Sequence, residues 1–220
     1  MDFEKEYFEN RKYSSKECVI KRHFLDVLNW ASKYSGVNFF DGKGKTALAI
    51  GCGYGFEVDM LTSFGYEAYG IDISKFGIKK AKKCFNLTDF VVCDVQNGIP
   101  FREGTFDLLT CFGVLEHLKY PERALGNMFP VCKDVIICTS PNRLVENPLK
   151  QLTRDVDETH INVKTKKEWE QAINEKMSKS FLKIESFFDV SLRAAGKLLF
   201  FRSFKVPYFG IDFRILIRKQ

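Results

Sequence analysis

Residues 46–74, TALAIGCGYGFEVDMLTSFGYEAYGIDIS, decide the fold of this chain. The stretch begins with residues 46–50, a short apolar run without acids or bases, which is typical of a strand covered on both faces. A loop with three glycines follows, and apolar residues then recur at a helical spacing up to Phe64. Residues 66–71 predict a second strand with Asp72 at its tip. This order of strand, glycine loop, helix and strand predicts a nucleotide-binding α/β unit.

The glycine loop and the acid after the second strand give the first functional signal. Gly51, Gly53 and Gly55 lack Cβ, so the chain can turn sharply and a ligand can approach the backbone. The helix that follows begins with unpaired N–H groups and a positive dipole end, which favour an anionic group. Asp72 follows Gly51 by about 20 positions, where nucleotide-binding sheets use a carboxylate to accept hydrogen bonds from a ribose diol. The third glycine of a dinucleotide fingerprint would fall at Phe56, so the spacing is G-x-G-x-G instead.

With this spacing the stretch resembles the class I S-adenosylmethionine (SAM) dependent methyltransferases. The resemblance extends over about residues 40–220. It implies an α/β fold with a Rossmann-like, seven-stranded, mostly parallel sheet, helices on both faces and an antiparallel last strand. It also implies SAM as the cofactor and S-adenosylhomocysteine (SAH) as the product.

Two further stretches resemble segments of the same family. Residues 94–101, DVQNGIPF, resemble its D-a-x-x-L-P-F segment, in which the acid accepts a hydrogen bond from the adenine amine. The next backbone N–H in that segment meets a ring nitrogen, so these roles are implied for Asp94 and Val95. Residues 106–118, FDLLTCFGVLEHL, match the family's FD-l-v-x-x-x-g-V-L-E-H-l signature, which implies that the backbone around Phe112 lies beside the methionine part of SAM.

The first 45 residues precede the nucleotide core and contain a predicted amphipathic helix over residues 18–34, capped by Ser14 or Ser15. N-terminal helices of the family often fold over the cofactor as a lid, so Tyr13 and Arg11 are lid candidates; anchoring aromatics on the core is the alternative. The complete set of predicted cofactor-binding residues is Tyr13, Gly51, Cys52, Gly53, Gly55, Asp72, Ile73, Asp94, Val95 and Phe112.

Residues 157–165, DETHINVKT, resemble the D-P-T-H-x-N-x-x-[ST] stretch of the small-molecule branch, which includes ubiquinone-biosynthesis O-methyltransferases. Methyl transfer from a sulfonium is an in-line displacement, so the protein must align the reactants, exclude water and remove a proton where needed. The candidate catalytic residues are His160, His117 and Glu116; a structural histidine is the alternative reading. Quinone-type relatives carry another acid at the position of Gly113 that helps to hold a divalent metal, and its absence leads us to predict no metal site.

One position departs from the family pattern. The family usually has Asp or Glu two residues before the first glycine, where it supports the cofactor loop and the ammonium group, but here the residue is Ala49. Losing an acceptor beside a buried cation weakens binding. Three alternatives follow: Glu57 or Asp59 compensates, the affinity is modest, or the domain has lost catalysis. Compensation is the preferred hypothesis.

Composition sets outer bounds on the protein. The 220 residues fit a single domain, with residues 1–45 as a helical lid and residues 46–220 as the SAM-binding core. Seven cysteines without a C-x-x-C pair argue against a disulfide framework or a zinc site and indicate a reducing, cytoplasmic location. We see no signal peptide and no apolar run as long as a transmembrane span.

Residues 191–207, SLRAAGKLLFFRSFKVP, are an elaboration between the last two predicted strands, residues 181–190 and 208–217. The segment holds four basic residues, no acids and several large apolar side chains. It is expected to be a structural cover over the sheet, a substrate lid or an interfacial membrane contact.

The sequence therefore predicts a SAM-dependent methyltransferase that acts on the O, N or C atom of a small molecule. An RNA-modifying methyltransferase is an alternative because the net charge is +6, but the basic residues are dispersed along the sequence, so nucleic acid is not the favoured partner. A non-catalytic SAM-binding or scaffolding protein is a second alternative, prompted by Ala49. The sequence does not specify an oligomeric state.

Overall fold

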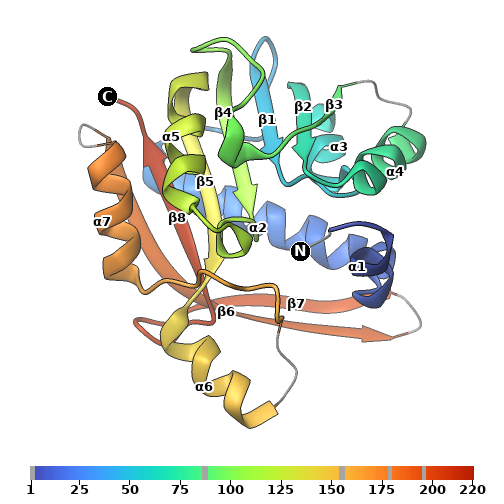
Figure 1. Cartoon of the computed structure of the whole chain (residues 1–220), viewed down its shortest axis with the longest axis vertical. Helices are drawn as coiled ribbons and strands as arrows, with labels where there is room; N and C mark the ends of the chain where they lie inside the picture. Colours follow the sequence, from blue (N-terminus) through green and yellow to red (C-terminus); the bar gives the residue numbers. More distant parts are fainter. Residues whose placement is uncertain (1–2, 86–88, 154–156, 178–179, 195–196) are drawn as a thin grey trace.

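The computed structural model describes residues 3–85, 89–153, 157–177, 180–194 and 197–220 (Figure 1). The helices are α1 Lys5–Asn10, α2 Glu17–Ser35, α3 Phe56–Ser63, α4 Lys75–Phe85, α5 Pro121–Val131, α6 Arg143–Thr153 and α7 Lys166–Lys176. The strands are β1 Thr46–Ile50, β2 Glu67–Asp72, β3 Phe90–Val92, β4 Phe106–Phe112, β5 Cys132–Pro141, β6 Phe181–Ala194, β7 Lys197–Lys205 and β8 Asp212–Arg218. Within the described ranges, no helix is long and apolar enough to cross a membrane.

One sheet organises the described part of the chain, with the strand order β3-β2-β1-β4-β5-β8-β6-β7. The first five strands of the sequence run parallel, and β8 pairs antiparallel with both β5 and β6. The strand order reverses beside β1, and open α/β sheets bind ligands beyond the carboxyl ends of the strands at such a point. The prediction of a Rossmann-like, mostly parallel sheet with an antiparallel carboxyl-terminal part is confirmed.

Alternate residues of the central strands face opposite sides of the sheet, as the period of two requires. In β1, Ala47 and Ala49 pack with α2 and α3, whereas Leu48 and Ile50 pack with α5 and α7 on the other face. All four side chains are buried. The helices therefore cover both faces of the sheet, as the sequence predicts.

Local signals that the sequence shows explain several element boundaries. Gly65 follows α3 with a φ of 93°, the left-handed conformation expected of a residue after a helix end. The Ser74 hydroxyl accepts a hydrogen bond from the Gly77 N–H at 2.9 Å and caps α4. Thr165 and Glu168 form a capping box at the start of α7. The predicted Ser cap of α2 is wrong, because the N-cap residue is Lys16 and makes no side-chain capping bond.

The elaboration over residues 191–207 is part of the sheet. Strand β7 pairs antiparallel with β6 from Phe187–Lys205 to Ala194–Lys197, so it extends the sheet at its edge and does not cover a face. The described residues thus form eight strands, whereas the resemblance implied seven. Ser191 and Phe201 reach the functional cavity described below, whereas the Leu199 side chain is 62% exposed.

The N-terminal segment is fastened to the core at two points. The Glu4 carboxylate accepts hydrogen bonds from the backbone N–H groups of Lys75 and Phe76 at 3.1 and 3.0 Å, at the start of α4. Arg11 forms an ion pair with Asp157, whose side chain is almost completely buried. The segment therefore bridges the α4 side of the molecule and the loop before α7, and α1 lies below α4 in the view of Figure 1.

Candidate active site

A cavity of about 800 Å³ lies beyond the carboxyl ends of the strands. Its lining crosses the sheet from Asp72 at the end of β2 to Phe201 on β7, and the N-terminal segment contributes aromatic side chains to its wall. The predicted cofactor-binding residues that line it are Tyr13, Gly51, Gly53, Asp72, Ile73, Asp94, Val95 and Phe112. Segments far apart in the sequence thus meet in one space, of a size typical for small-molecule sites.

Asp72 fixes the glycine loop. Its carboxylate accepts hydrogen bonds from the backbone N–H of Gly53 and of Ser74, each at 2.8 Å. Burial raises the pKa of Asp72, while these two hydrogen bonds lower it in part. A carboxylate has about four acceptor positions, so two remain for a ligand hydroxyl pair. The observed geometry is therefore compatible with the ribose contact that the sequence predicts.

Each glycine of the loop leaves room for a different neighbouring side chain. A Cβ on Gly51 would lie 2.2 Å from Val114, and one on Gly53 would lie 2.8 Å from the Tyr13 hydroxyl. A Cβ on Gly55 would lie 2.8 Å from the Phe90 ring, and Gly55 does not line the cavity. Gly55 is thus needed for packing under the loop rather than for approach of a ligand.

Cys52, the remaining residue of the predicted loop set, is buried and packs with the α2–α3 face of the sheet. Its side chain does not line the cavity. Any contribution of Cys52 to a ligand would therefore come from its backbone.

Aromatic rings cover the glycine loop. Tyr13 stacks on Phe56 with a centroid distance of 5.7 Å, and Phe8 stacks on Tyr54 at 4.8 Å. Burial, together with the nearby Glu57 and Asp72 charges, raises the pKa of Tyr13 well above its usual value, so the phenol stays protonated. Tyr13 both anchors the N-terminal segment and lines the cavity, so the two sequence-based readings of this residue are compatible.

Asp94 follows the end of β3 and lines the cavity. Its carboxylate accepts hydrogen bonds from the Gln96 backbone N–H and from the Asn97 side chain, each at 2.9 Å. Asp94 therefore forms the Asx-type turn typical of this residue while it also lines the cavity. Val95 is buried beside it, so the chain is fixed at the predicted adenine position.

Of the two acids that the sequence analysis named as substitutes for an acid at position 49, one lies in the cavity. Glu57 lines the cavity, and its carboxylate accepts a hydrogen bond from the Thr110 hydroxyl at 3.2 Å. Thr110 is the register partner of Ala49 in the neighbouring strand. The Glu57 carboxylate therefore lies close to the position at which the family usually has its acid. Burial raises the pKa of Glu57 to about 8. Asp59 does not line the cavity and pairs instead with Lys21 at 2.9 Å.

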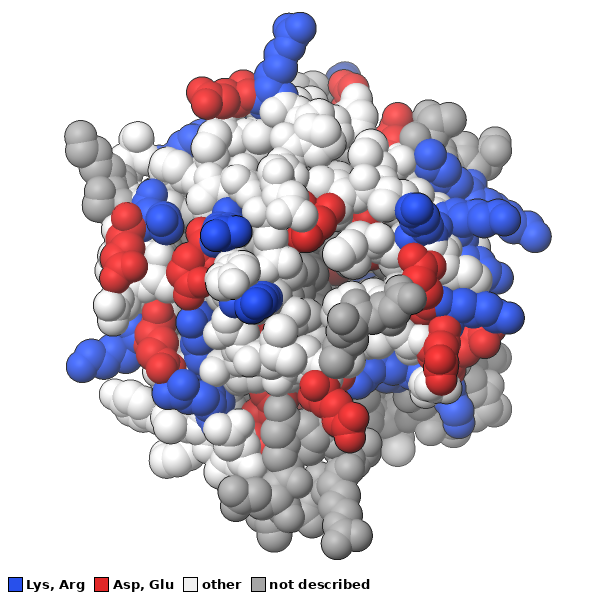
Figure 2. Space-filling model, in the orientation of Figure 1, with Lys and Arg blue, Asp and Glu red and all other residues white. Residues whose placement is uncertain are grey.

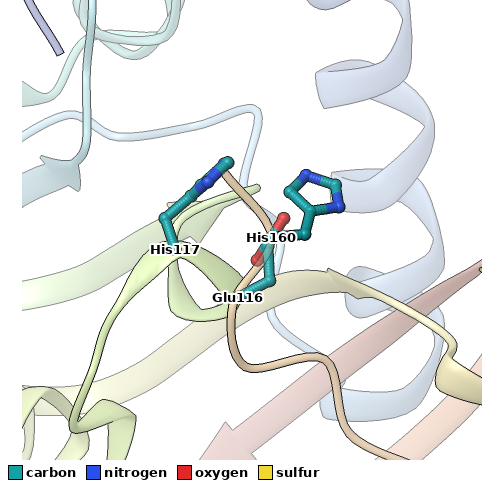
Figure 3. Close-up of side chains that lie close together, drawn as sticks. All are labelled: Glu116, His117 and His160. Atoms are coloured by element: carbon teal, nitrogen blue, oxygen red, sulfur yellow. The ribbon is translucent and has the colours of Figure 1, made fainter. Parts of the chain in front are cut away.

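The predicted catalytic residues meet in one cluster (Figure 3). Glu116 and His117 come from the turn after β4 and His160 from the loop before α7, and the figure shows all three side chains close together. One ligand atom from each lies within 4.8 Å of the others. Glu116 is 2% exposed, and burial raises its pKa to about 8.

The two histidines of the cluster have opposite charge states. His160 Nδ1 lies 2.6 Å from Glu146 and Nε2 lies 3.3 Å from Asp157. Burial alone would lower the pKa of His160, but the hydrogen bonds to Asp157 and Glu146 raise it to about 9. Burial and the neighbouring His160 lower the pKa of His117 to about 4, so this ring is neutral at pH 7. A protonated His160 cannot accept a proton, and we do not retain it as the base.

The same cluster is the group of described residues that offers ligand atoms to a metal ion. Both ring nitrogens of His160 are already within hydrogen-bond distance of carboxylates, so metal ligation would require one of these contacts to break. Gly113, at the position of the family's additional acid, adds no ligand. We therefore build no step on a metal.

The sequence analysis missed a second histidine in the cavity wall. His23 on α2 lies with Nδ1 2.7 Å from an oxygen of Asp189 on β6, and both residues line the cavity. The His23 ring also contacts Phe112 with a centroid distance of 6.2 Å. The two residues are 166 positions apart in the sequence. In the sequence, the signal available for His23 was its place as a polar residue on the apolar side of the predicted helix over residues 18–34.

The open sheet with its glycine loop and acidic strand tip defines an α/β nucleotide-binding protein of the Rossmann-like class. Residues 48–136 match the family model described as "Methyltransferase domain". The fold resembles a SAM-dependent methyltransferase from Thermotoga maritima, with a TM-score of 0.68 at 16% identity over 98% of both chains. Residues 48–136 therefore match a methyltransferase domain, and the fold is that of SAM-dependent methyltransferases.

Curated relatives of the chain act on very different acceptors. The sequence is 30% identical over 102 residues to an 18S rRNA (guanine-N(7))-methyltransferase of Schizosaccharomyces pombe, over 42% of this chain and 38% of that protein. It is 36% identical over 83 residues to a ubiquinone biosynthesis O-methyltransferase of Paraburkholderia xenovorans, over 36% of this chain and 35% of that protein. The chain therefore matches well under half the length of these relatives.

The charge states of the two histidines predict opposite pH dependences of stability. The folded-state pKa of His160 lies near 9, above its ordinary value of about 6.5, so its stabilisation is present below pH 6.5 and is lost as the pH rises through 9. We expect His160→Asn to lower Tm by about 5 °C at pH 6, with a much smaller difference at pH 9.5. Differential scanning calorimetry across this pH range measures the difference.

His117→Asn is the matched control. The pKa of His117 is lowered to about 4, so the wild-type protein loses stability as the pH falls from 6.5 toward 4 and the variant loses less. A Tm difference for His160→Asn that does not change with pH would contradict the doubly hydrogen-bonded, charged His160.

Proposed function

We propose that the protein transfers a methyl group from SAM to a small-molecule acceptor. The observation that carries this proposal is the single cavity that extends from Asp72 to Phe201 beneath the N-terminal segment. Its volume of about 800 Å³ is within the range of small-molecule sites, and it extends past the cofactor motifs toward β6, β7 and β8. The tethers at Glu4 and Arg11 keep the N-terminal segment over the cavity, which favours an acceptor small enough to be enclosed.

The residues at the glycine-loop end fit SAM by their chemistry. Asp72 keeps acceptor positions for a ribose diol, Asp94 and Val95 face the same space, and Glu57 offers a carboxylate for the ammonium group. When bound, SAM supplies an electrophilic methyl group on a sulfonium. The task of the protein is then to align the acceptor, exclude water and take up a proton.

We infer that His23 is the general base. Asp189 accepts a hydrogen bond from Nδ1–H at 2.7 Å, so Nε2 is the nitrogen left to accept a proton from a bound acceptor. The Asp189 carboxylate also receives Arg214 Nη2 at 3.5 Å, which holds it in position. His23 lies against Phe112, near the predicted position of the methionine part of SAM, whereas both nitrogens of His160 are engaged.

An RNA acceptor is the second candidate, and one surface feature favours it. Five lysines of α4 are exposed, and Lys and Arg atoms gather on the right-hand side of Figure 2, where α4 lies in Figure 1. The basic residues that are dispersed in the sequence thus gather in part on this surface. The lysines are Lys75, Lys79, Lys80, Lys82 and Lys83. Binding of RNA that weakens steeply with added salt would support this alternative.

The first test of the proposed function is calorimetric titration of the purified protein with SAH, with NAD as the control. We expect SAH to bind and NAD not to bind, because Phe56 replaces the third glycine of a dinucleotide loop. Asp72→Asn should weaken SAH binding at least tenfold, because an amide accepts at one atom only.

Binding of NAD, or the absence of SAH binding to a folded protein, would contradict the proposal. SAH binding without turnover on any acceptor would favour the scaffolding alternative.

The compensation for Ala49 has its own test. We expect Glu57→Gln to weaken SAH binding about tenfold, because a charge-assisted hydrogen bond to the ammonium group is lost. Asp59→Asn, two residues along the same helix, removes an equal charge outside the cavity and should change the affinity less than twofold. Equal effects of the two substitutions in the titration would exclude a specific role for Glu57.

The assignment of His23 as the general base predicts that its substitution lowers kcat but leaves SAH affinity nearly unchanged. His23→Asn should lower kcat about 100-fold or more on an acceptor that must lose a proton, while SAH affinity changes little. Asp189→Asn should lower kcat less, because it disturbs the orientation of the ring and leaves the nitrogen in place. A kcat that falls with His117→Asn and survives His23→Asn would move the role to His117.

A further inference from the structure

The end of the cavity away from the glycine loop is acidic. Glu116 from the turn after β4, Asp189 from β6 and Asp212 from the start of β8 all line this end. Aromatic rings of Phe112 and Phe201 share the same wall. A ligand in this half therefore meets carboxylates together with apolar surface.

The partners of these carboxylates differ. Asp189 is hydrogen-bonded to His23 and lies 3.5 Å from Arg214. Glu116 Oε2 is buried and has no hydrogen-bond partner among the residues that the structure describes. In the same described part of the chain, the Asp212 side chain forms no hydrogen bond or ion pair. One oxygen of Glu116 and the Asp212 carboxylate thus lack a partner among the described residues.

The nearby cations supply only part of the missing charge. His160 is held between Glu146 and Asp157, and Arg11 pairs with Asp157. Arg214 is shared between Asp26 and Asp189 at 3.0 and 3.5 Å. These cations all contact other acids, and although the charge of His160 also lowers the pKa of Glu116 and Asp212, burial still raises both pKa values above their usual range.

Two unpartnered carboxylates in an enclosed space repel each other, and burial disfavours their charged forms. Burial raises the pKa of Glu116 to about 8 and also raises the pKa of Asp212. A cationic ligand with N–H donors would relieve both effects, since an ammonium group presents up to three donors to carboxylate acceptors. A neutral acceptor could donate a hydrogen bond to Glu116 but would bring no charge to offset the two carboxylates, and an anionic acceptor would be repelled.

We propose that the methyl acceptor is a small amine that enters as an ammonium ion, with its charged group bound by Glu116 and Asp212 and its apolar body against Phe112 and Phe201. The inference rests on the proposed methyl transfer and narrows its acceptor from an O, N or C nucleophile to a nitrogen. The aromatic faces add a further attraction for a cation.

The chemistry balances with the residues described. The bound ammonium ion loses one proton to His23 Nε2 and becomes a neutral amine with a free electron pair. The nitrogen then forms a bond to the methyl carbon as the carbon–sulfur bond breaks, and the thioether leaves with that bond's electron pair. The product is a methylated ammonium ion, and the proton on His23 passes to water when the products leave.

Calorimetric titration of the SAH-saturated protein tests the proposal with matched ligands. Tyramine carries an ammonium group, tyrosol carries a hydroxyl in its place, and 4-hydroxyphenylacetate carries a carboxylate. Phenethylamine and propylamine extend the amine series, with 2-phenylethanol and propanol as their neutral counterparts. We expect at least one amine to bind tenfold or more tightly than its neutral counterpart, and no binding of the carboxylate.

The variants Glu116→Gln and Asp212→Asn should each reduce this preference about tenfold. Asp212→Asn should leave SAH affinity within twofold, which separates the acceptor end from the cofactor end. Asp41→Asn, an acid in an exposed loop outside the cavity, is the charge-matched control and should change neither affinity. Circular dichroism spectra of the variants establish that they are folded.

Each contrary result overturns the amine assignment. The amine assignment is wrong if the neutral counterparts bind as tightly as the amines. It is also wrong if the preference for amines persists in both Glu116→Gln and Asp212→Asn. Binding of Mg²⁺ or Zn²⁺ that depends on Glu116 and Asp212, without binding of any amine, would assign the acids to a metal. Failure of SAH itself to bind is a separate result and would refute the proposed function instead.

Discussion

The pair of hydrogen bonds to Asp72 is the constraint on which the rest of the site depends. One oxygen receives the Gly53 N–H and the other receives the Ser74 N–H, so a single carboxylate joins the loop after β1 to the start of α4. Gly51 and Gly53 have φ values of 69° and 51°, a conformation that costs other residues free energy. The Asp72 carboxylate stabilises this conformation through its hydrogen bond to Gly53. Val114 and the Tyr13 hydroxyl occupy the space that side chains at positions 51 and 53 would fill.

The N-terminal segment connects the two halves of the cavity physically. Glu4 caps the start of α4 on the cofactor side, and Arg11 reaches Asp157 on the acceptor side. Asp157 in turn contacts His160 Nε2 at 3.3 Å, so this histidine belongs to the same group of contacts that attaches the segment. His160 is therefore structural in its contacts, whereas His117 from the family-like signature and His23 outside any motif both line the cavity.

The sequence predicted the parts of the fold whose signals are local. Residues 46–50 form β1 as expected, because a parallel strand covered on both faces must be apolar throughout. The helix α5 was not predicted, since Gly126 and Pro130 interrupt the helical pattern, and its contacts with residues Val95–Asn97 and with β5 stabilise it instead. Strand β7 was not predicted either, because only its pairing with β6 defines it.

The same limit applies to the site residues. Asp72 could be identified by its spacing from the glycine loop, and Phe112 by its place in a stretch that resembles a family signature. The contact between His23 and Asp189 depends on α2 and β6 meeting across the sheet, and no local pattern encodes that meeting. Asp212 was missed for a similar reason: its carboxylate matters because β8 is inserted between β5 and β6.

Position 49 shows why the absence of one motif residue is weak evidence for lost function. Ala49 is completely buried and is the register partner of Thr110 in the neighbouring strand. Its small side chain leaves room beside Thr110 for a side chain from α3. Glu57 reaches that level from the first turn of the helix and receives the Thr110 hydroxyl. A cationic ligand group recognises the position of a carboxylate and not the strand or helix that carries it. An acidic group therefore lies near position 49 even without the motif acid, and because burial raises the pKa of Glu57 to about 8, a bound ammonium group would favour its charged form.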